Sequence, residues 1–280
     1  MKYCLYIFGL LLLLSNCSNK KGIDLPLEEY KNEIKALNSK DYHTYWEQLR
    51  NFDQKVVIEA KNYKAYDSLT LVTLIKSALF YELKGDSIFK APNTYNEIFF
   101  IHNHIPKSNL DFWPLLIKQK EIKDDVLMFP SYQLEGITSS FYDYSVFGQD
   151  SIYEHLLSQI KPDSDKKLSE ALIDTYLETK RIQKLSIKEE IGAWHRKRFK
   201  SEAYEPPKGN FELLKLSDNG YYIRFNKTGF KPVNIIENNT KDFAFRPKYD
   251  PFGWYFVLDN NGDLRLYNEK DDLLIAYTKV

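Results

Sequence analysis

The chain has 280 residues, with 39 basic and 39 acidic side chains and a formal net charge of zero. This balance gives no general attraction to nucleic acid or to an acidic membrane surface, and it argues against a nucleic-acid-binding class. The chain is long enough to bury the core of one large domain or of two ordinary ones.

The N-terminal residues have the pattern of a secretory signal. Lys2 precedes an apolar stretch, Tyr3 to Leu14, that is too short to span a bilayer as a stable helix. The stretch ends in Leu14-Ser15-Asn16-Cys17, which resembles the lipobox of bacterial lipoproteins. In that family the chain is cut before the cysteine and the thiol is acylated. The resemblance implies a signal peptide at 1–16 and a lipid such as palmitate on Cys17.

Such a lipid implies a place in the bacterial cell envelope, facing the periplasm or the cell surface. Buried methylene groups, and not protein charge, would then supply the membrane affinity. Cys4 would leave with the signal and Cys17 would carry the lipid, so no disulfide is expected although the compartment is oxidising. Residues 17–25 would be the lipidated cysteine and its tether.

Helical patterns begin after this tether. Pro26 is a good first-turn residue, and the pattern predicts a helix to about Asn38. A second helix is expected from about Tyr42 to Tyr63, and a third from near Asp67 to Gly85. The third has apolar residues at helical spacing, which indicates a place near the core centre. These are Leu71, Leu74, Ile75, Ala78 and Leu79.

Further helices are predicted in the middle of the chain. Pro114 opens one that runs to about Lys123. A capping box at Ser151–Glu154 opens another, to Ile160, and a long helix begins at Asp163 or Ser164 and ends near Lys184. A second capping box, Ser186–Glu189, predicts a last helix to about Lys200.

The pattern changes at Glu205-Pro-Pro-Lys-Gly209, through which a helix cannot continue. Asp218-Asn-Gly220 and Asn260-Asn-Gly-Asp263 are hairpin turn signals. The predicted fold class is α+β, with a mainly helical domain at 26–205 followed by a small antiparallel β-sheet domain at 210–280. Strands are expected at Tyr221–Phe225, Trp254–Leu258, Leu264–Leu266 and Leu273–Tyr277.

Two histidines, His102 and His104, follow a short apolar run. In a strand, residues i and i+2 share one face, and two such imidazoles are a common start of a zinc site. In a helix the same spacing separates them by roughly 200° around the axis, so they would not share a metal easily. Further ligands would have to come from elsewhere, and the candidates are Asp111, Glu97, Glu82 and His155.

The stretch His102-Asn-His104-Ile-Pro106, followed by Ser108-Asn-Leu-Asp111, is similar to the motif of the JAMM (or JAB) metalloproteases. The similarity implies that His102, His104 and Asp111 bind zinc, that Ser108 supports the oxyanion, and that a glutamate such as Glu82 serves a zinc-bound water. The alternative interpretation is that one histidine hydrogen-bonds a loop and the other is exposed.

Two other stretches have a simple and a functional interpretation. The basic cluster Trp194–Lys200 could grip a phosphate or an acidic glycan, but a predicted helix C-terminus also attracts cations. Asp259–Asp263 has calcium-loop residue types without EF-hand spacing, and its expected structure is a type I′ turn.

Aromatic residues cluster near the C-terminus, at Tyr249, Phe252, Trp254 and Tyr255. Exposed, they could stack on sugar rings or on a protein partner; buried, they would fill a core that lacks disulfides. No convincing catalytic set is present. The sequence therefore favours a lipid-anchored envelope protein that acts as a binding or assembly module for a protein or carbohydrate partner. The alternative is a zinc-dependent hydrolase of the peptidase or amidase type.

Overall fold

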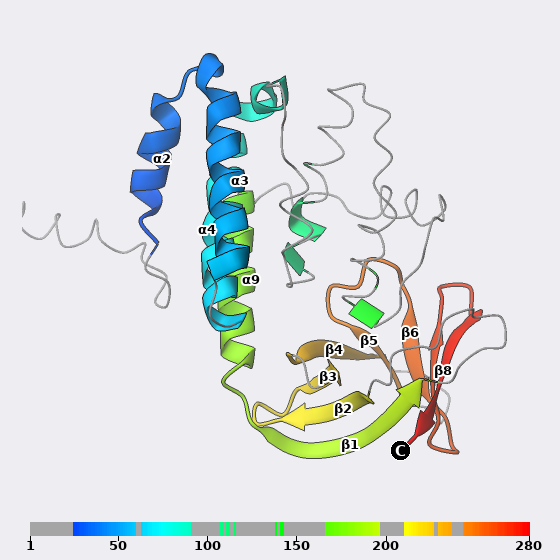
Figure 1. Ribbon diagram of the computed structural model, residues 1–280. Coiled ribbons are helices and arrows are strands. Elements are labelled where there is room, and N and C mark those ends of the chain that lie inside the picture. Colours follow the sequence, from blue (N-terminus) through cyan, green and yellow to red (C-terminus); the bar gives the residue numbers. More distant parts are fainter. Residues whose placement is uncertain are drawn as a thin grey trace, which may run out of the picture.

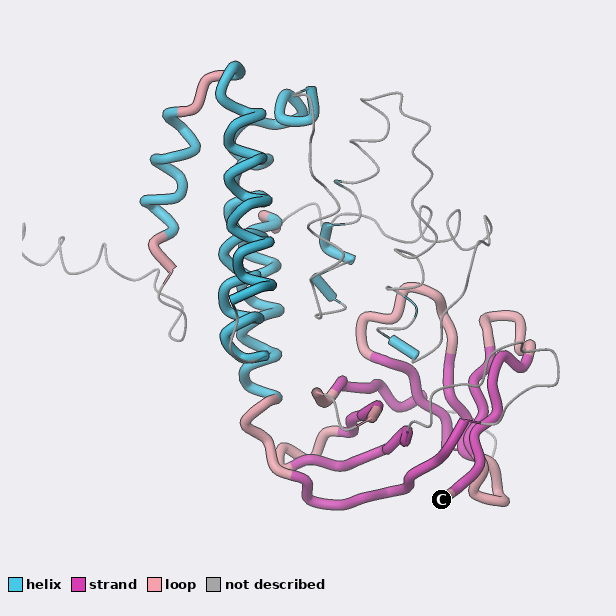
Figure 2. Tube along the Cα trace, viewed as in Figure 1, coloured by secondary structure: helices cyan, strands magenta, loops and turns pink. Residues whose placement is uncertain are grey.

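The computed structural model describes most of the chain from residue 25 onward (Figure 1). The described residues are 25–59, 63–90, 107–108, 110–112, 115, 138, 141–142, 166–196, 210–226, 229–236 and 243–280. They form a group of helices and a β-barrel, joined where the last helix passes into the first strand (Figure 2).

The helical part contains α2 (Leu27–Ala36), α3 (Tyr42–Glu59), α4 (Tyr63–Lys84) and α9 (Leu168–Ile182), with short 3-10 helices at Ser39–Asp41 and Gly85–Lys90. The helices predicted in these four regions are confirmed. The helices predicted at Pro114–Lys123 and Ser151–Ile160 lie outside the described residues, apart from Leu115.

Helix α4 lies at the centre, because it contacts α2, α3 and α9. Its Phe80 is fully buried and meets three aromatic rings of α3, those of Tyr42, Tyr45 and Trp46, at centroid distances of 5.1, 4.9 and 5.4 Å. Its last residue, Lys84, donates to the carbonyls of Lys35 and Leu37, at 3.0 and 2.7 Å. An ammonium group at these carbonyls satisfies the C-terminus of α2 and fixes it to α4.

The β part is a closed antiparallel barrel in which the strands follow chain order and β1 pairs with β8. The predicted α+β class is confirmed, but the prediction of a small sheet domain is wrong, because the sheet closes on itself. The strands are β1 (Ile187–Arg196), β2 (Asn210–Leu216), β3 (Tyr221–Phe225), β4 (Lys231–Ile236), β5 (Phe243–Pro247), β6 (Tyr255–Leu258), β7 (Leu264–Tyr267) and β8 (Leu273–Lys279).

The helix predicted from Ser186 to Lys200 is wrong, because Ile187–Arg196 forms strand β1. Two irregularities in its pairing with β2, at Ile187/Glu189 and at Glu190/Gly192, break the alternation that would mark a strand in the sequence. Pairing with strands on both sides outweighs the local capping signal. His195 and Arg196 are therefore strand residues and do not complement a helix dipole.

Aromatic side chains fill the barrel. Phe211 lies at the middle of the core, with its ring centroid 4.9 Å from that of Phe256, 5.1 Å from Phe225 and 5.4 Å from Tyr277. An eight-stranded barrel is just wide enough for side chains to fill it. The core also includes Trp194, Leu213, Ile223, Phe245, Leu264, Leu266 and Ile275.

Both predicted hairpin turns are present. Asn219 has a φ of 66° in the turn between β2 and β3, and Gly262 has a φ of 82° in the turn between β6 and β7. A type I′ turn needs a positive φ at two central residues, and here Gly262 alone has one between Asp259 and Asp263. The type I′ assignment is therefore wrong, although the hairpin is correct.

Among the described helices, none combines the length and apolar character that a membrane crossing requires.

Candidate functional site

The two histidines of the predicted zinc site, His102 and His104, lie outside the described residues. The third predicted ligand, Asp111, is mostly buried and forms an ion pair with Lys107. Burial raises the pKa of Asp111, while Lys107 and a hydrogen bond from Thr175 oppose the rise. The ion pair engages Oδ1 of Asp111, while the buried Oδ2 accepts no hydrogen bond within the described part of the chain. Within the described residues, no group of three or more potential ligands could hold a metal ion.

Glu82, the available glutamate, has a structural role. Its Oε1 accepts a hydrogen bond from the backbone N–H of Ser169 at 2.7 Å, and its Oε2 accepts one from the Ser169 hydroxyl at 3.0 Å. Ser169 is in the first turn of α9, where backbone N–H groups lack helical partners. A carboxylate from α4 therefore caps α9 and joins the two helices.

Two members of the predicted aromatic group, Phe252 and Trp254, are buried, with 1% and 6% exposure. Their ring centroids lie 5.0 Å apart, and the ring of Tyr142 lies 5.0 Å from that of Trp254. The Tyr142 hydroxyl donates to the Trp254 carbonyl at 3.3 Å. Phe252 and Trp254 are thus core side chains, which is the alternative that the sequence left open for this group.

Tyr249 is the most exposed member of the group, at 38%. Its φ of 68° is unusual for a bulky residue. Its hydroxyl donates to Glu178 Oε2 at 2.8 Å, and the ammonium nitrogens of Lys248 and Lys107 lie 4.7 and 5.5 Å from its ring centroid. These contacts hold Tyr249 in the left-handed conformation at the junction of α9 and the barrel.

Tyr255 lies on the outer surface of the barrel. The neighbouring Phe256 is fully buried in the core, so alternation directs Tyr255 outward. Tyr255 pairs across β6 and β7 with Tyr267, and the two rings stack at 5.7 Å with 24° between their planes. The Tyr255 hydroxyl donates to Asp271 Oδ1 at 2.6 Å. Burial, and then the hydrogen bond to Asp271, raise the pKa of Tyr255 to about 12.

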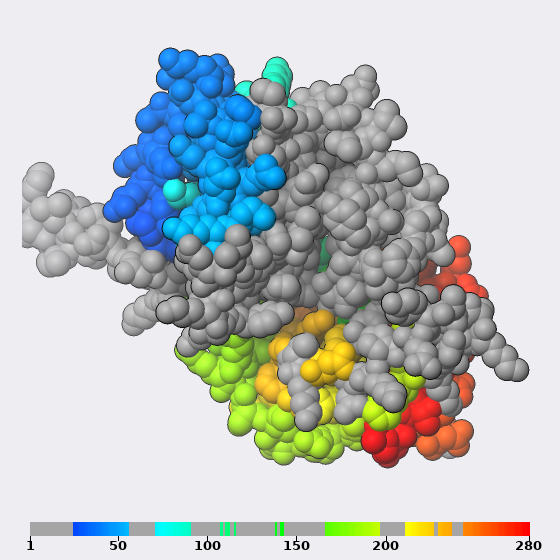
Figure 3. Space-filling model, viewed as in Figure 1, coloured from blue at the N-terminus to red at the C-terminus, as the bar shows by residue number. Residues whose placement is uncertain are grey.

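Tyr267 is not among the site residues predicted from the sequence. The hairpin turn could have predicted its pairing with Tyr255. The two tyrosines lie at equal distances on either side of Asn261, the middle residue of the Asp259–Asp263 turn, so they face each other across the hairpin. Near Tyr267, Arg265 hydrogen-bonds its side chain and pairs with Asp259 at 2.9 Å. The pair Tyr255–Tyr267 and Arg265 are hereafter the tyrosine face. Figure 3 shows atoms of the C-terminal strands, coloured orange to red, at the surface.

The structure thus defines a helical region joined to a side-chain-filled barrel with stacked tyrosines on its outer surface. Comparisons of the chain with protein-family models, with curated proteins and with solved structures find no match.

Proposed function

We propose that this chain is a binding module of the bacterial cell envelope, held to a membrane by a lipid on Cys17 and contacting its partner through the tyrosine face. The observation that supports the proposal is the outward stack of Tyr255 on Tyr267. Because the barrel interior is filled by side chains, a partner would have to meet the outer surface.

The chemistry of the tyrosine face favours a protein partner over a carbohydrate. The two rings face each other, so part of the area that would stack on a sugar is already covered. Hydrogen bonds fix both side chains, which lowers the entropy cost of contact with a partner. Tyrosine and arginine are also the residue types enriched at protein–protein contacts.

A photo-crosslinking amino acid at Val257 tests this function in cells. Val257 pairs with Arg265 on the outer side of β6 and β7. We expect one discrete higher-mass adduct, reduced about tenfold or more by Tyr255→Ala/Tyr267→Ala, because central aromatic contacts each contribute about 2 kcal/mol or more. The readout is an immunoblot of the full chain after irradiation.

The matched control is Tyr30→Ala, which removes a tyrosine of α2 and should leave the adduct unchanged. A crosslinker at Glu28, on the exposed side of α2, reports non-specific capture. The same adducts from Val257 and Glu28 would contradict the proposal. Loss of binding to purified cell-wall glycan in the double variant, without a protein adduct, would instead identify a carbohydrate partner.

Lipidation is tested separately by metabolic labelling with an alkyne analogue of palmitate. We expect label in the full chain and its loss in Cys17→Ala, because the lipid is attached through the thiol of that residue. Cys4→Ala is the matched control and should keep the label. Label that persists in Cys17→Ala would contradict the lipobox prediction.

The hydrolase alternative gains no support from the ion pair that occupies Asp111. A zinc site at His102 and His104 stays a prediction.

A further inference from the structure

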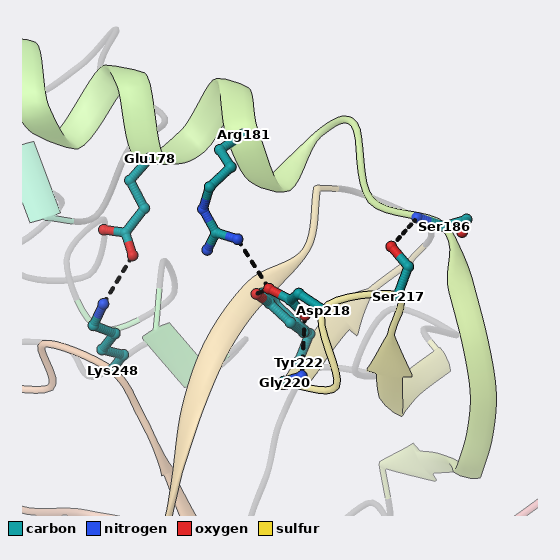
Figure 4. Close-up of polar contacts among 8 residues, drawn as sticks. All are labelled: Glu178, Arg181, Ser186, Ser217, Asp218, Gly220, Tyr222 and Lys248. Carbon is teal, nitrogen blue, oxygen red and sulfur yellow. Dashed lines mark hydrogen bonds and ion pairs between the residues drawn. The ribbon is translucent and has the colours of Figure 1, made fainter.

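Two ion pairs of opposite polarity join α9 to the barrel (Figure 4). Glu178 of α9 accepts a hydrogen bond from Lys248 of the barrel at 2.8 Å. One helical turn further along, Arg181 of α9 donates to Asp218 of the β2–β3 turn at 2.9 Å. Along α9 an anion is therefore followed by a cation. The barrel residues that they contact are, in the same order, a cation and then an anion.

Each carboxylate has a tyrosine as a second donor. The Tyr249 hydroxyl donates to Glu178 at 2.8 Å, and the Tyr222 hydroxyl donates to Asp218 at 2.7 Å. Burial alone would raise the pKa of both carboxyl groups, but the hydrogen bonds outweigh it, and both pKa values are lowered. Both groups are therefore ionised at neutral pH, and both ion pairs are fully charged.

Apolar contacts accompany the ion pairs. Ile182, at the end of α9, packs against Leu214, Leu216 and Tyr222 on the outside of β2 and β3. The connector beyond it is pinned by the Ser217 N–H, which donates to the Ser186 carbonyl at 2.9 Å. Between its cap at Ser169 and these contacts, α9 spans roughly 18 Å.

We propose that this pair of opposite charges is a register lock that allows a single position of α9 against the barrel. Helices can move past a packed neighbour by one turn. If α9 moved one turn toward the barrel, Glu178 would take the place of Arg181 and face Asp218. If it moved one turn away, Arg181 would face Lys248. Both shifts place like charges together, which penalises them.

The lock has a consequence that rests on the proposed function. Helix α9 is joined to α4 through Glu82 at one end and to the barrel at the other. The tyrosine face is then held in one orientation relative to the helices that follow the tether, so a partner would meet it in a fixed geometry.

Hydrogen exchange by mass spectrometry on the full chain tests the lock without any partner, so its failure is distinct from failure of the proposed function. We expect Glu178→Lys to speed exchange about fivefold or more at the end of α9, at the 217–220 turn and at 247–250. The double variant Glu178→Lys/Lys248→Glu restores an opposite pair at the native position, but α9 then carries two cations and the barrel two anions. Both one-turn shifts become attractive, so exchange in these segments should stay about twofold or more above the wild type.

Glu33→Lys is the matched control, because it reverses the charge of a pair of similar length and exposure, Glu33–Lys76 at 2.7 Å, within the helical part. It should leave the three junction segments unchanged. Glu178→Gln preserves the side-chain shape and should give a smaller effect of the same sign. Faster exchange confined to the helix end, or a double variant as slow as the wild type, would overturn the register lock.

Discussion

Gly192→Ala is expected to lower the free energy of unfolding by about 1–3 kcal/mol, the usual cost of inserting a methyl group into a packed core. A Cβ at this position would lie 2.4 Å from Cη2 and 2.6 Å from Cζ2 of the Trp194 ring. That ring is 1% exposed, and its Nε1 donates to the Gly262 carbonyl at 2.7 Å. Burial and this hydrogen bond leave the ring little room to move away from an added methyl group.

Gly229→Ala is the matched control, because a Cβ there meets nothing within 4 Å. The same substitution at this open site is expected to change the free energy of unfolding by less than about 1 kcal/mol. The change should be an increase, because alanine lowers the conformational entropy of the unfolded chain. Urea unfolding of the full chain, with equal m-values checked, gives both numbers. Equal midpoints for the two variants would show that Trp194 can adjust at little cost.

The long helices were predictable because their apolar residues repeat over several turns, as in Leu71, Leu74 and Ile75 of α4. The β hairpins were predictable from their turn residues. Strand β1 was not predictable from the sequence. Its alternation of apolar and polar residues is interrupted by Gly192, which leaves room for the Trp194 ring, and by two irregularities in its pairing with β2. Barrel closure depends on pairing of Trp194–Arg196 with Tyr277–Lys279, and no local pattern reports contacts at that separation.

The candidate site was predictable in part. Tyr255 and Tyr249 were named together with Phe252 and Trp254, although the latter two are buried. Alternation along β6 separates Tyr255 from its buried neighbours, once the strand face is known. The contacts of Tyr249 were beyond sequence reasoning, since its partner Glu178 lies 71 positions away. Ion pairs between distant segments leave no periodic signal.

Asp53→Asn is expected to raise the free energy of unfolding at pH 7. Asp53 lies on the same face of α3 as Trp46 and Leu49, and it is 1% exposed. Burial raises its pKa to about 6, while a hydrogen bond with Gln54 opposes the rise. At pH 7 the folded state therefore holds a carboxylate that burial disfavours, and an uncharged amide of the same shape removes this cost.

The size of the effect follows from the pKa difference. The folded pKa lies above the unfolded value, so the folded state binds more protons and stability rises as the pH falls from about 7 toward 4. Replacement by asparagine should add about 1–3 kcal/mol to the free energy of unfolding at pH 7 and flatten this pH dependence.

Glu47→Gln, an exposed change on α3, is the control and should shift stability by less than about 0.5 kcal/mol. Urea unfolding of the three proteins at pH 4 to 7 measures both quantities. A loss of stability in Asp53→Asn at pH 7 would mean that partners of Asp53 favour its ionised form over the neutral one.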